Sequence, residues 1–177
     1  MPVIVAVISQ KGGVGKSTLA RALAVAAAGD GLAVRLADLD TQQRTLVFWG
    51  ETRVANGVSP AIAVEAFAHA GEAVASARTG EVMILDTGGQ VNDATLALVQ
   101  RAHLVEFGYG VLPGAIPERA AYRTALDSGR SPAECDDASA SMPMEILVQA
   151  VLAKVHALCA LGSRPAGTRS RQVRKRA

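Results

Sequence analysis

The sequence comprises 177 residues, enough for one domain of ordinary size and too few for two. Half of the residues are apolar and only 3% are aromatic, which suits helices packed on a sheet and argues against a platform of exposed rings for nucleic-acid stacking. The two cysteines, Cys135 and Cys159, have neither the spacing of a metal site nor that of a disulfide framework, so we expect reduced thiols in a cytoplasmic protein. No uninterrupted apolar stretch reaches the roughly 18 residues of a membrane span, and the N-terminal run lacks the basic flank of a secretory signal.

Charge is unevenly distributed along the chain. The formal net charge is +2, yet all 16 acidic residues precede residue 164. The segment from residue 164 onward contains only basic charged residues, namely Arg164, Arg169, Arg171, Arg174, Lys175 and Arg176. Such a segment can contact the phosphates of DNA or anionic lipid headgroups, although a solvated, disordered end is the simpler interpretation.

The N-terminal part of the chain predicts a strand–helix–strand unit. Val3–Ser9 is an apolar, β-branched run of the kind that forms a strand buried on both faces in a parallel sheet. A glycine-rich turn, Gln10–Gly15, leads into Ser17–Ala28, which is rich in helix formers and ends at Gly29. Ala33–Ala37 then predicts a second strand, and together these elements indicate the α/β class.

Weaker patterns continue through the middle of the chain. Ala61–Phe67 and Glu81–Leu85 are predicted to be strands, with Ala68–Arg78 as a helix between them. Asn92–Arg101 is predicted to be helical. His103–Glu106 indicates one more strand, interrupted by its glutamate.

The pattern changes beyond residue 106. Phe107–Pro117 is rich in glycine and proline, and Ser128–Pro143 is small, polar and acidic, which predicts loop or disorder. Met144–Leu161 predicts one apolar helix with a stripe of large side chains, for which core packing is favoured over membrane contact. We therefore divide the chain into a nucleotide-binding core at 1–105, an atypical part with one long helix at 106–163, and a basic, disordered tail at 164–177.

The chemistry is concentrated in the turn between the first strand and the first helix. Residues 11–18 read KGGVGKST, and the glycines of such a turn allow backbone N–H groups to converge on phosphate oxygens at a helix N-terminus. We expect Lys16 to reach the β- and γ-phosphates of ATP and Ser17 to ligate Mg²⁺. The residues expected to bind the nucleotide are Gly12, Gly13, Val14, Gly15, Lys16, Ser17 and Thr18.

Lys11 is an additional lysine, because an ordinary phosphate-binding loop requires only the later one. With it, KGGVGKST resembles the deviant Walker A motif of the ParA/MinD family of ATPases, which partition plasmids and chromosomes or position cell division. The resemblance implies a P-loop NTPase fold, a mostly parallel sheet flanked by helices. It also implies an ATP-dependent homodimer in which Lys11 of one subunit contacts the phosphates bound by the other, so that hydrolysis is coupled to dimerisation.

Carboxylates follow two of the predicted strands. In open α/β sheets, ligand-binding residues lie at the carboxyl ends of strands, where Asp38, Asp40 and Asp86 are expected. DLDTQQ resembles the switch segment of the family, with Thr41 in place of a proline, and implies that Asp40 orients the attacking water and that Asp38 lies near the Mg²⁺ shell. EVMILD resembles a Walker B strand, which implies that Asp86 holds Mg²⁺ through water.

Trp49 follows the switch segment, as in short plasmid-type relatives. We interpret it as a packing residue of the core or an interface, without a catalytic role.

The motif resemblance ends at residue 105. The different character of the remainder suggests a degenerate or frameshifted C-terminal half and a sheet that is incomplete beyond that point. Such a sheet would expose an edge and an apolar face, which the helix at Met144–Leu161 could cover in part.

The leading functional hypothesis is a ParA-like ATPase that uses ATP and Mg²⁺ for plasmid or chromosome partitioning. Its expected partners are a second copy of the chain, nonspecific DNA and a partition protein that stimulates hydrolysis. Two alternatives stay open: a degenerate remnant that binds nucleotide without turnover, and MinD-like placement of the division site. Membrane insertion is not expected, because Val173 is the only large apolar residue of the extreme C-terminal segment.

Overall fold

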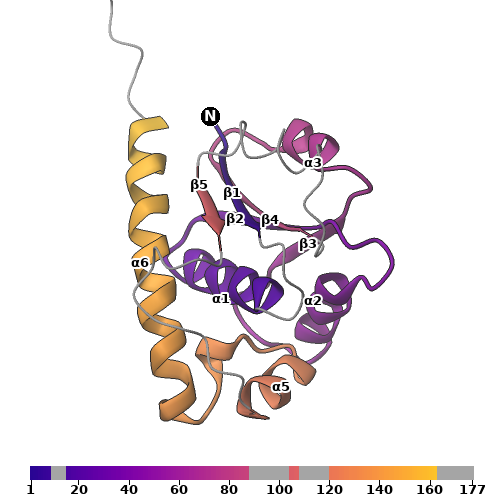
Figure 1. Cartoon of the computed structure of the whole chain (residues 1–177), viewed down its shortest axis with the longest axis vertical. Helices are drawn as coiled ribbons and strands as arrows, with labels where there is room; N and C mark the ends of the chain where they lie inside the picture. The colour runs from indigo at the N-terminus through magenta and orange to yellow at the C-terminus, as the bar shows by residue number, and fades with distance from the viewer. Residues whose placement is uncertain (9–14, 88–103, 108–119, 163–177) are drawn as a thin grey trace, which may run out of the picture.

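A five-stranded sheet forms the centre of the protein in the computed structural model, which describes residues 1–8, 15–87, 104–107 and 120–162. The strands lie in the order β3-β2-β4-β1-β5, and all four neighbouring pairs are parallel. This arrangement confirms the predicted α/β class with a mostly parallel sheet (Figure 1). The strands are β1 (Val3–Ile8), β2 (Ala33–Asp38), β3 (Ala63–Ala66), β4 (Glu81–Asp86) and β5 (Leu104–Phe107).

Helices cover both faces of this sheet. One face packs against α1 and α2, with α6 lying across α1, whereas α3 lies on the other face (Figure 1). The short α5 lies beyond α1 and α2, near the start of α6 (Figure 1), and the 3₁₀ turn η1 contacts α1, α5 and α6. The bounds are α1 (Lys16–Gly29), α2 (Thr45–Ala55), α3 (Ala70–Ser76), α5 (Ala120–Asp127), η1 (Pro132–Glu134) and α6 (Ala138–Gly162).

The first strand supplies side chains to two separate hydrophobic cores. Val3, Val5 and Val7 pack into the larger core with α1 and α6, whereas Ile4, Ala6 and Ile8 pack into the smaller core beneath α3. All six residues of β1 are buried. A strand between two helical layers must be apolar at every position, which is why this run predicted a strand of a parallel sheet.

The strand predictions are confirmed at all five positions, with bounds that shift by a few residues. The predicted helices at residues 17–28 and 68–78 correspond to α1 and to the shorter α3. Two helices, α2 and α5, were not predicted, whereas the predicted helix at 92–101 lies outside the described residues. Residues 108–117 of the predicted Gly/Pro-rich segment also lie outside them. Glu106 does not interrupt β5, because its backbone continues the ladder opposite Val7.

The prediction of loop or disorder for Ser128–Pro143 is confirmed as loop up to Asp137, apart from a 3₁₀ turn, and is wrong for residues 138–143, which are helical. This segment contains η1 and the beginning of α6, and Ser131 is completely buried. Its order comes from distant parts of the chain: the Trp49 indole N–H donates to the Arg130 carbonyl at 3.0 Å, and Arg53 donates to the Gly129 carbonyl at 3.0 Å. A small, polar composition predicts disorder only when nothing else binds the backbone.

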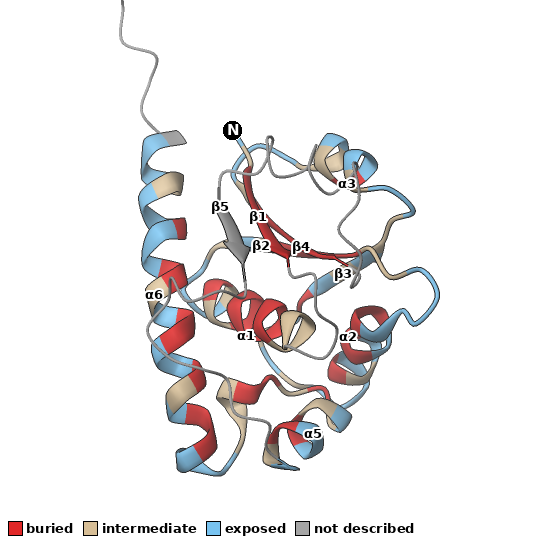
Figure 2. Ribbon diagram, in the orientation of Figure 1, coloured by how far each residue is buried: buried red, intermediate tan, exposed pale blue. Residues whose placement is uncertain are grey.

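The long helix α6 joins the core along one stripe. Six large apolar residues of α6 are buried and belong to the same core cluster as α1: Met144, Leu147, Val148, Val151, Leu152 and Val155. Figure 2 shows the buried positions as red bands along this helix. By length and apolar composition alone α6 could also span a membrane. The buried stripe supports the predicted core packing, since it belongs to the same hydrophobic cluster as α1 and the sheet.

The close approach of α2 to the loop after α5 requires a glycine at position 129. Gly129 has a φ of +77°, and a Cβ there would lie 2.5 Å from both the Cα and the nitrogen of Arg53. The Gly129→Ala variant is therefore expected to lose at least about 2 kcal/mol of unfolding free energy, through left-handed backbone strain and overpacking against a backbone that cannot move aside. Urea denaturation measures this loss.

Gly57 offers a matched control for that substitution. Its φ is +62°, but a Cβ there would meet no atom within 4 Å. The Gly57→Ala variant should therefore lose only about 1 kcal/mol, the cost of the backbone conformation alone. Equal losses in the two variants would contradict the proposed close contact at Gly129.

Candidate functional site

Those predicted site residues that the structure describes lie at the carboxyl edge of the sheet. β1, β2 and β4 are adjacent and parallel, so the residues that follow or end them lie at the same edge. Asp86 is the register partner of Val7 on one side and of Asp38 on the other. Lys11, Gly12, Gly13 and Val14 lie outside the described residues, and their predicted roles stay predictions.

Gly15 turns the chain into α1. Its φ of +89° lies in the left-handed region, which favours glycine, and the N–H of Leu19 donates to its carbonyl at 2.8 Å to begin the helix. The first turn of α1 contains no acidic side chain, and Lys16 and Ser17 are its first two residues. No acidic side chain of the first turn therefore repels an anion at the positive end of the helix, as a phosphate-binding turn requires.

Asp86 is the most perturbed carboxylate of the site. Its side chain is buried, 5% exposed, and accepts a hydrogen bond from Ser17. Burial raises the pKa of Asp86 to about 6; neighbouring Asp38 also raises it, whereas the Ser17 hydrogen bond and the charges of Arg21 and Lys16 lower it. Its Oδ1 atom has no hydrogen-bond partner among the described residues. A buried carboxylate oxygen without a hydrogen-bond partner can accept a hydrogen bond from the water shell of a cation.

Asp38 performs a structural task that its motif did not indicate. Its Oδ1 accepts the backbone N–H of Asp40 at 3.0 Å, and its Oδ2 accepts those of Leu46 at 3.0 Å and Val47 at 3.4 Å. The carboxylate therefore caps the N-terminus of α2 from a distance, in place of a local capping side chain. Its predicted place near the Mg²⁺ shell stays a prediction.

Asp40 shapes the switch segment. Its Oδ1 accepts the backbone N–H groups of Gln42 at 3.2 Å and Gln43 at 3.0 Å, an aspartate turn that folds the chain back toward α2. The turn forms with Thr41 in the position where the family motif has proline. Asp40 is half-buried, and its predicted action on the attacking water stays a prediction.

Two arginines whose burial was not predicted from the sequence flank Trp49. The guanidinium carbons of Arg21 and Arg53 lie 5.9 Å and 5.5 Å from the centroid of the indole ring. Trp49 is 3% exposed, which confirms its interpretation as a packing residue. Buried arginines are uncommon enough that only the fold could reveal them, since an isolated arginine in a sequence is usually exposed.

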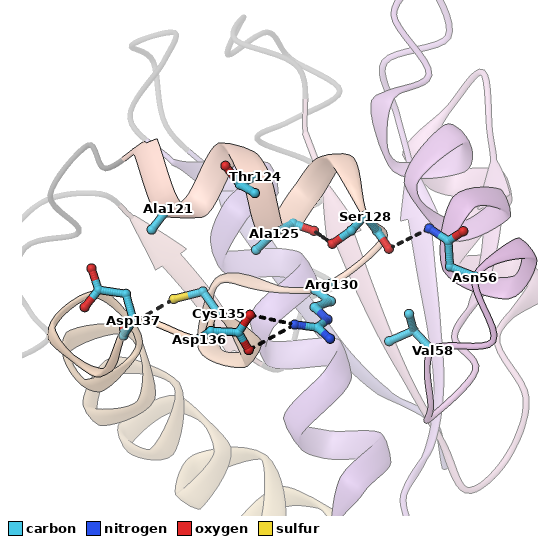
Figure 3. Close-up of a pocket in the computed structure, with 10 residues that line it drawn as sticks. All are labelled: Asn56, Val58, Ala121, Thr124, Ala125, Ser128, Arg130, Cys135, Asp136 and Asp137. Carbon is cyan, nitrogen blue, oxygen red and sulfur yellow. Dashed lines mark hydrogen bonds and ion pairs between the residues drawn. The ribbon is translucent and has the colours of Figure 1, made fainter.

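A separate hollow lies between the end of α2 and α5. It encloses about 500 Å³ and is open to solvent (Figure 3). Arg130 and Asp136 form an ion pair at 3.1 Å inside it, and the carbonyl of Ser128 accepts the side-chain amide of Asn56 at its rim. None of the predicted site residues lines this hollow.

The residues of the sheet edge fit Mg²⁺ and a triphosphate together. No group of three or more metal-ligating side chains exists among residues 1–8, 15–87, 104–107 and 120–162. Mg²⁺ in nucleotide sites needs only one or two carboxylates or hydroxyls, because phosphate oxygens and water complete its shell. Ser17 and the unpartnered oxygen of Asp86 meet that requirement beside Lys16.

Comparison with known proteins agrees with this geometry. Residues 5–151 match the model of the CobQ/CobB/MinD/ParA nucleotide-binding domain, whereas no curated protein matches the chain. The match continues well past residue 105, where the motif resemblance ended, and includes α5 and part of α6. The family match thus extends beyond the part of the chain that contains the motifs, while the atypical character of the C-terminal half and the change of reading frame stay predictions. The chain belongs to the CobQ/CobB/MinD/ParA family of nucleotide-binding domains.

Proposed function

We propose that the chain is a Mg²⁺-dependent ATPase that dimerises on ATP and serves the partitioning of plasmids or chromosomes. The observation that carries the proposal is the meeting of Lys16, Ser17 and the unpartnered oxygen of Asp86 at the N-terminal end of α1. Family membership supports nucleotide binding and ATPase chemistry in general. The partition role rests on the deviant Walker A resemblance.

Each residue of the site has a distinct task in this proposal. The amides of residues 12–18 and the Lys16 ammonium bind the β- and γ-phosphates and spread their charge. Ser17 and Asp86 hold the cation, and their mutual hydrogen bond fixes the hydroxyl in place. When bound, Mg²⁺ neutralises charge on the β- and γ-phosphate oxygens. Asp40, on the segment between β2 and α2, orients the water for attack.

Dimerisation and DNA binding complete the proposed cycle. Lys11 would supply a second ammonium to the phosphates held by the partner subunit, which links turnover to assembly. The basic residues after position 163 would contact DNA phosphates, so that DNA binding weakens steeply as salt is raised. A partition protein would accelerate hydrolysis in the dimer.

Removing the Lys16 ammonium is expected to weaken binding of ATP with Mg²⁺ by about 10- to 100-fold, the range of one charge-assisted hydrogen bond to phosphate. Isothermal titration of the Lys16→Ala variant measures the effect. Lys154, which is exposed on the outer face of α6, provides the matched control, and Lys154→Ala should bind as the parent chain does. Equal affinity in the parent chain and Lys16→Ala would contradict the proposed site.

Dimerisation is tested separately by light scattering with ATP and Mg²⁺. The parent chain should form a dimer, whereas Lys11→Ala should bind ATP and stay monomeric.

Two alternative functions predict other results. A nucleotide-binding remnant would show ATP turnover equal to that of Lys16→Ala, with and without DNA. MinD-like membrane placement is disfavoured by the buried stripe of α6, and co-sedimentation with anionic liposomes in the presence of ATP would detect it.

A further inference from the structure

Arg21 stands between the nucleotide site and helix α2. It lies one helical turn after Ser17 on α1, and its side chain is almost fully buried, 8% exposed. Its Nη2 donates to the carbonyl of Thr45, the first residue of α2, at 3.1 Å. The same guanidinium lies over the ring of Trp49 on the next turn of α2. Arg21 therefore holds the N-terminal end of α2 against α1.

The same guanidinium acts on the two buried carboxylates of the site. Asp38 and Asp86 are register partners on neighbouring strands, 1% and 5% exposed, so their charges repel one another away from bulk water. Both carboxylates attract Arg21, and this attraction opposes the larger effect of burial, which lowers the pKa of the arginine. Because an arginine keeps its proton in proteins, it provides a permanent positive charge behind the acid pair.

Asp38 and Arg21 hold the same end of α2 from two sides. Asp38 accepts the N–H groups of Leu46 and Val47, while Arg21 donates to the carbonyl of the preceding residue. The switch segment with Asp40 ends where α2 begins. These contacts link the acid pair to the start of α2 and to the segment that contains Asp40.

We propose that Arg21 is a positioning residue of the ATPase site, which places Asp38 and the switch segment for turnover and transmits occupancy of the site to Trp49 on α2. The inference rests on the proposed function, since it concerns how the same nucleotide site works. Arg21 touches no reacting atom; it acts through the carboxylates and through the first turn of α2.

The chain contains a single tryptophan, so its emission reports on the surroundings of Trp49, of which Arg21 is one part beside Arg53 and the Arg130 carbonyl. Binding of ATP with Mg²⁺ is measured by equilibrium dialysis, and Trp49 emission is recorded on the same samples. The parent chain should bind nucleotide and change its emission in proportion to occupancy. Absence of nucleotide binding by the parent chain would overturn the proposed function and this inference together.

Two substitutions separate the charge of Arg21 from its shape. Arg21→Met should bind ATP with an affinity within about threefold of that of the parent chain. Its kcat should fall about tenfold, as when a residue that orients a ligand-binding side chain is removed. It should also lose most of the change in Trp49 emission on ATP binding. Arg21→Lys keeps the charge and should recover kcat to within about threefold. Its Trp49 response should stay below half of the parental one, because a lysine cannot both bond the Thr45 carbonyl and cover the ring.

A merely structural arginine would give a different result. Arg21→Met would then lower stability, while kcat, KM and the Trp49 response per folded molecule would equal those of the parent chain. That outcome overturns the inference and leaves the proposed function intact. Arg78→Met, at an exposed position far from the acid pair, is the matched control and should change none of these quantities. If Arg21→Met fails to fold, Arg21→Lys decides: an undiminished Trp49 response in that variant overturns the inference.

Discussion

The Arg53→Met variant is expected to lose about 3–5 kcal/mol of unfolding free energy, the cost of breaking a buried ion pair from one side. Arg53 is completely buried, and its guanidinium donates to Glu134 twice, at 2.8 and 2.9 Å. It also donates to the carbonyls of Pro60 and Gly129. The substitution removes these hydrogen bonds and leaves Glu134 with the backbone N–H of Ser131 as a donor, so thermal unfolding should shift downward by roughly 6–20 °C.

An exposed ion pair next to the buried one supplies the control. The Arg130 and Asp136 side chains are 43% and 95% exposed, so Arg130→Met should cost less than about 1 kcal/mol. Removing both partners of the buried pair, Arg53→Met with Glu134→Leu, should recover part of the loss because no buried charge is left alone. Equal losses for Arg53→Met and Arg130→Met in urea denaturation would show that burial does not govern the energetics of this pair.

The same pair makes a defined contribution to pH dependence. Burial favours a higher pKa of Glu134, but hydrogen bonds from Arg53 and from the Ser131 backbone, with the charge of Arg53, lower it overall. A lowered carboxyl pKa means stability that is present above the ordinary pKa and lost as the pH falls through the value in the folded chain. Part of the acid sensitivity of the protein should therefore disappear in the Arg53→Met, Glu134→Leu double variant.

Replacing Asp86 by asparagine is expected to have opposite effects on stability and on metal dependence. The folded chain raises the pKa of Asp86 from 3.8 to about 6, so between these values the folded state keeps a proton that the unfolded state releases. The stabilising effect of that proton is complete below the ordinary pKa and is lost as the pH rises through about 6. At pH 8, without nucleotide, Asp86→Asn should therefore be more stable than the parent chain by at most about 3 kcal/mol.

The gain in stability should come with a loss of Mg²⁺-dependent ATP affinity, because an amide cannot replace a carboxylate at a hard cation. In the parent chain, the contribution of Mg²⁺ to ATP affinity should itself decline as the pH falls below about 6, since a proton and the cation compete for Asp86. Urea denaturation and titration with ATP, each from pH 5 to 8, measure both effects. Asp136→Asn, at a fully exposed carboxylate, should show neither. A stability difference for Asp86→Asn that is constant across this range would contradict burial as the cause of the raised pKa.

Much of the fold could be predicted from local patterns. A strand between two helical layers needs apolar side chains at every position. The apolar runs of β1 and β4 were therefore enough to predict both strands. A phosphate-binding turn needs glycines, a lysine and a hydroxyl in fixed order, and these requirements identified Gly15, Lys16 and Ser17. The carboxyl-edge rule placed Asp38 and Asp86 beside them, and the β2–β4 register agrees.

Helix α2 could not be predicted, because its buried face is not simply apolar. It contains Trp49, Gly50 and Arg53, and only the acceptors around Arg53 make its burial favourable. The segment after α5 was predicted to be loop or disorder for the same reason: its partners Trp49 and Arg53 lie about 80 residues earlier in the chain. Contacts between residues so far apart in the sequence produce no periodic pattern of apolar residues in either segment.

The sequence by itself thus predicted where phosphate and cation would bind, since this chemistry needs particular residue types at adjacent positions. The tertiary structure alone decided how that site is joined to the rest of the molecule. It placed Arg21 behind the acid pair, made Asp38 the cap of α2, and paired Arg53 with Glu134. The physical reason is that burial sets the energy of a charge, and burial is known only once distant segments have packed together.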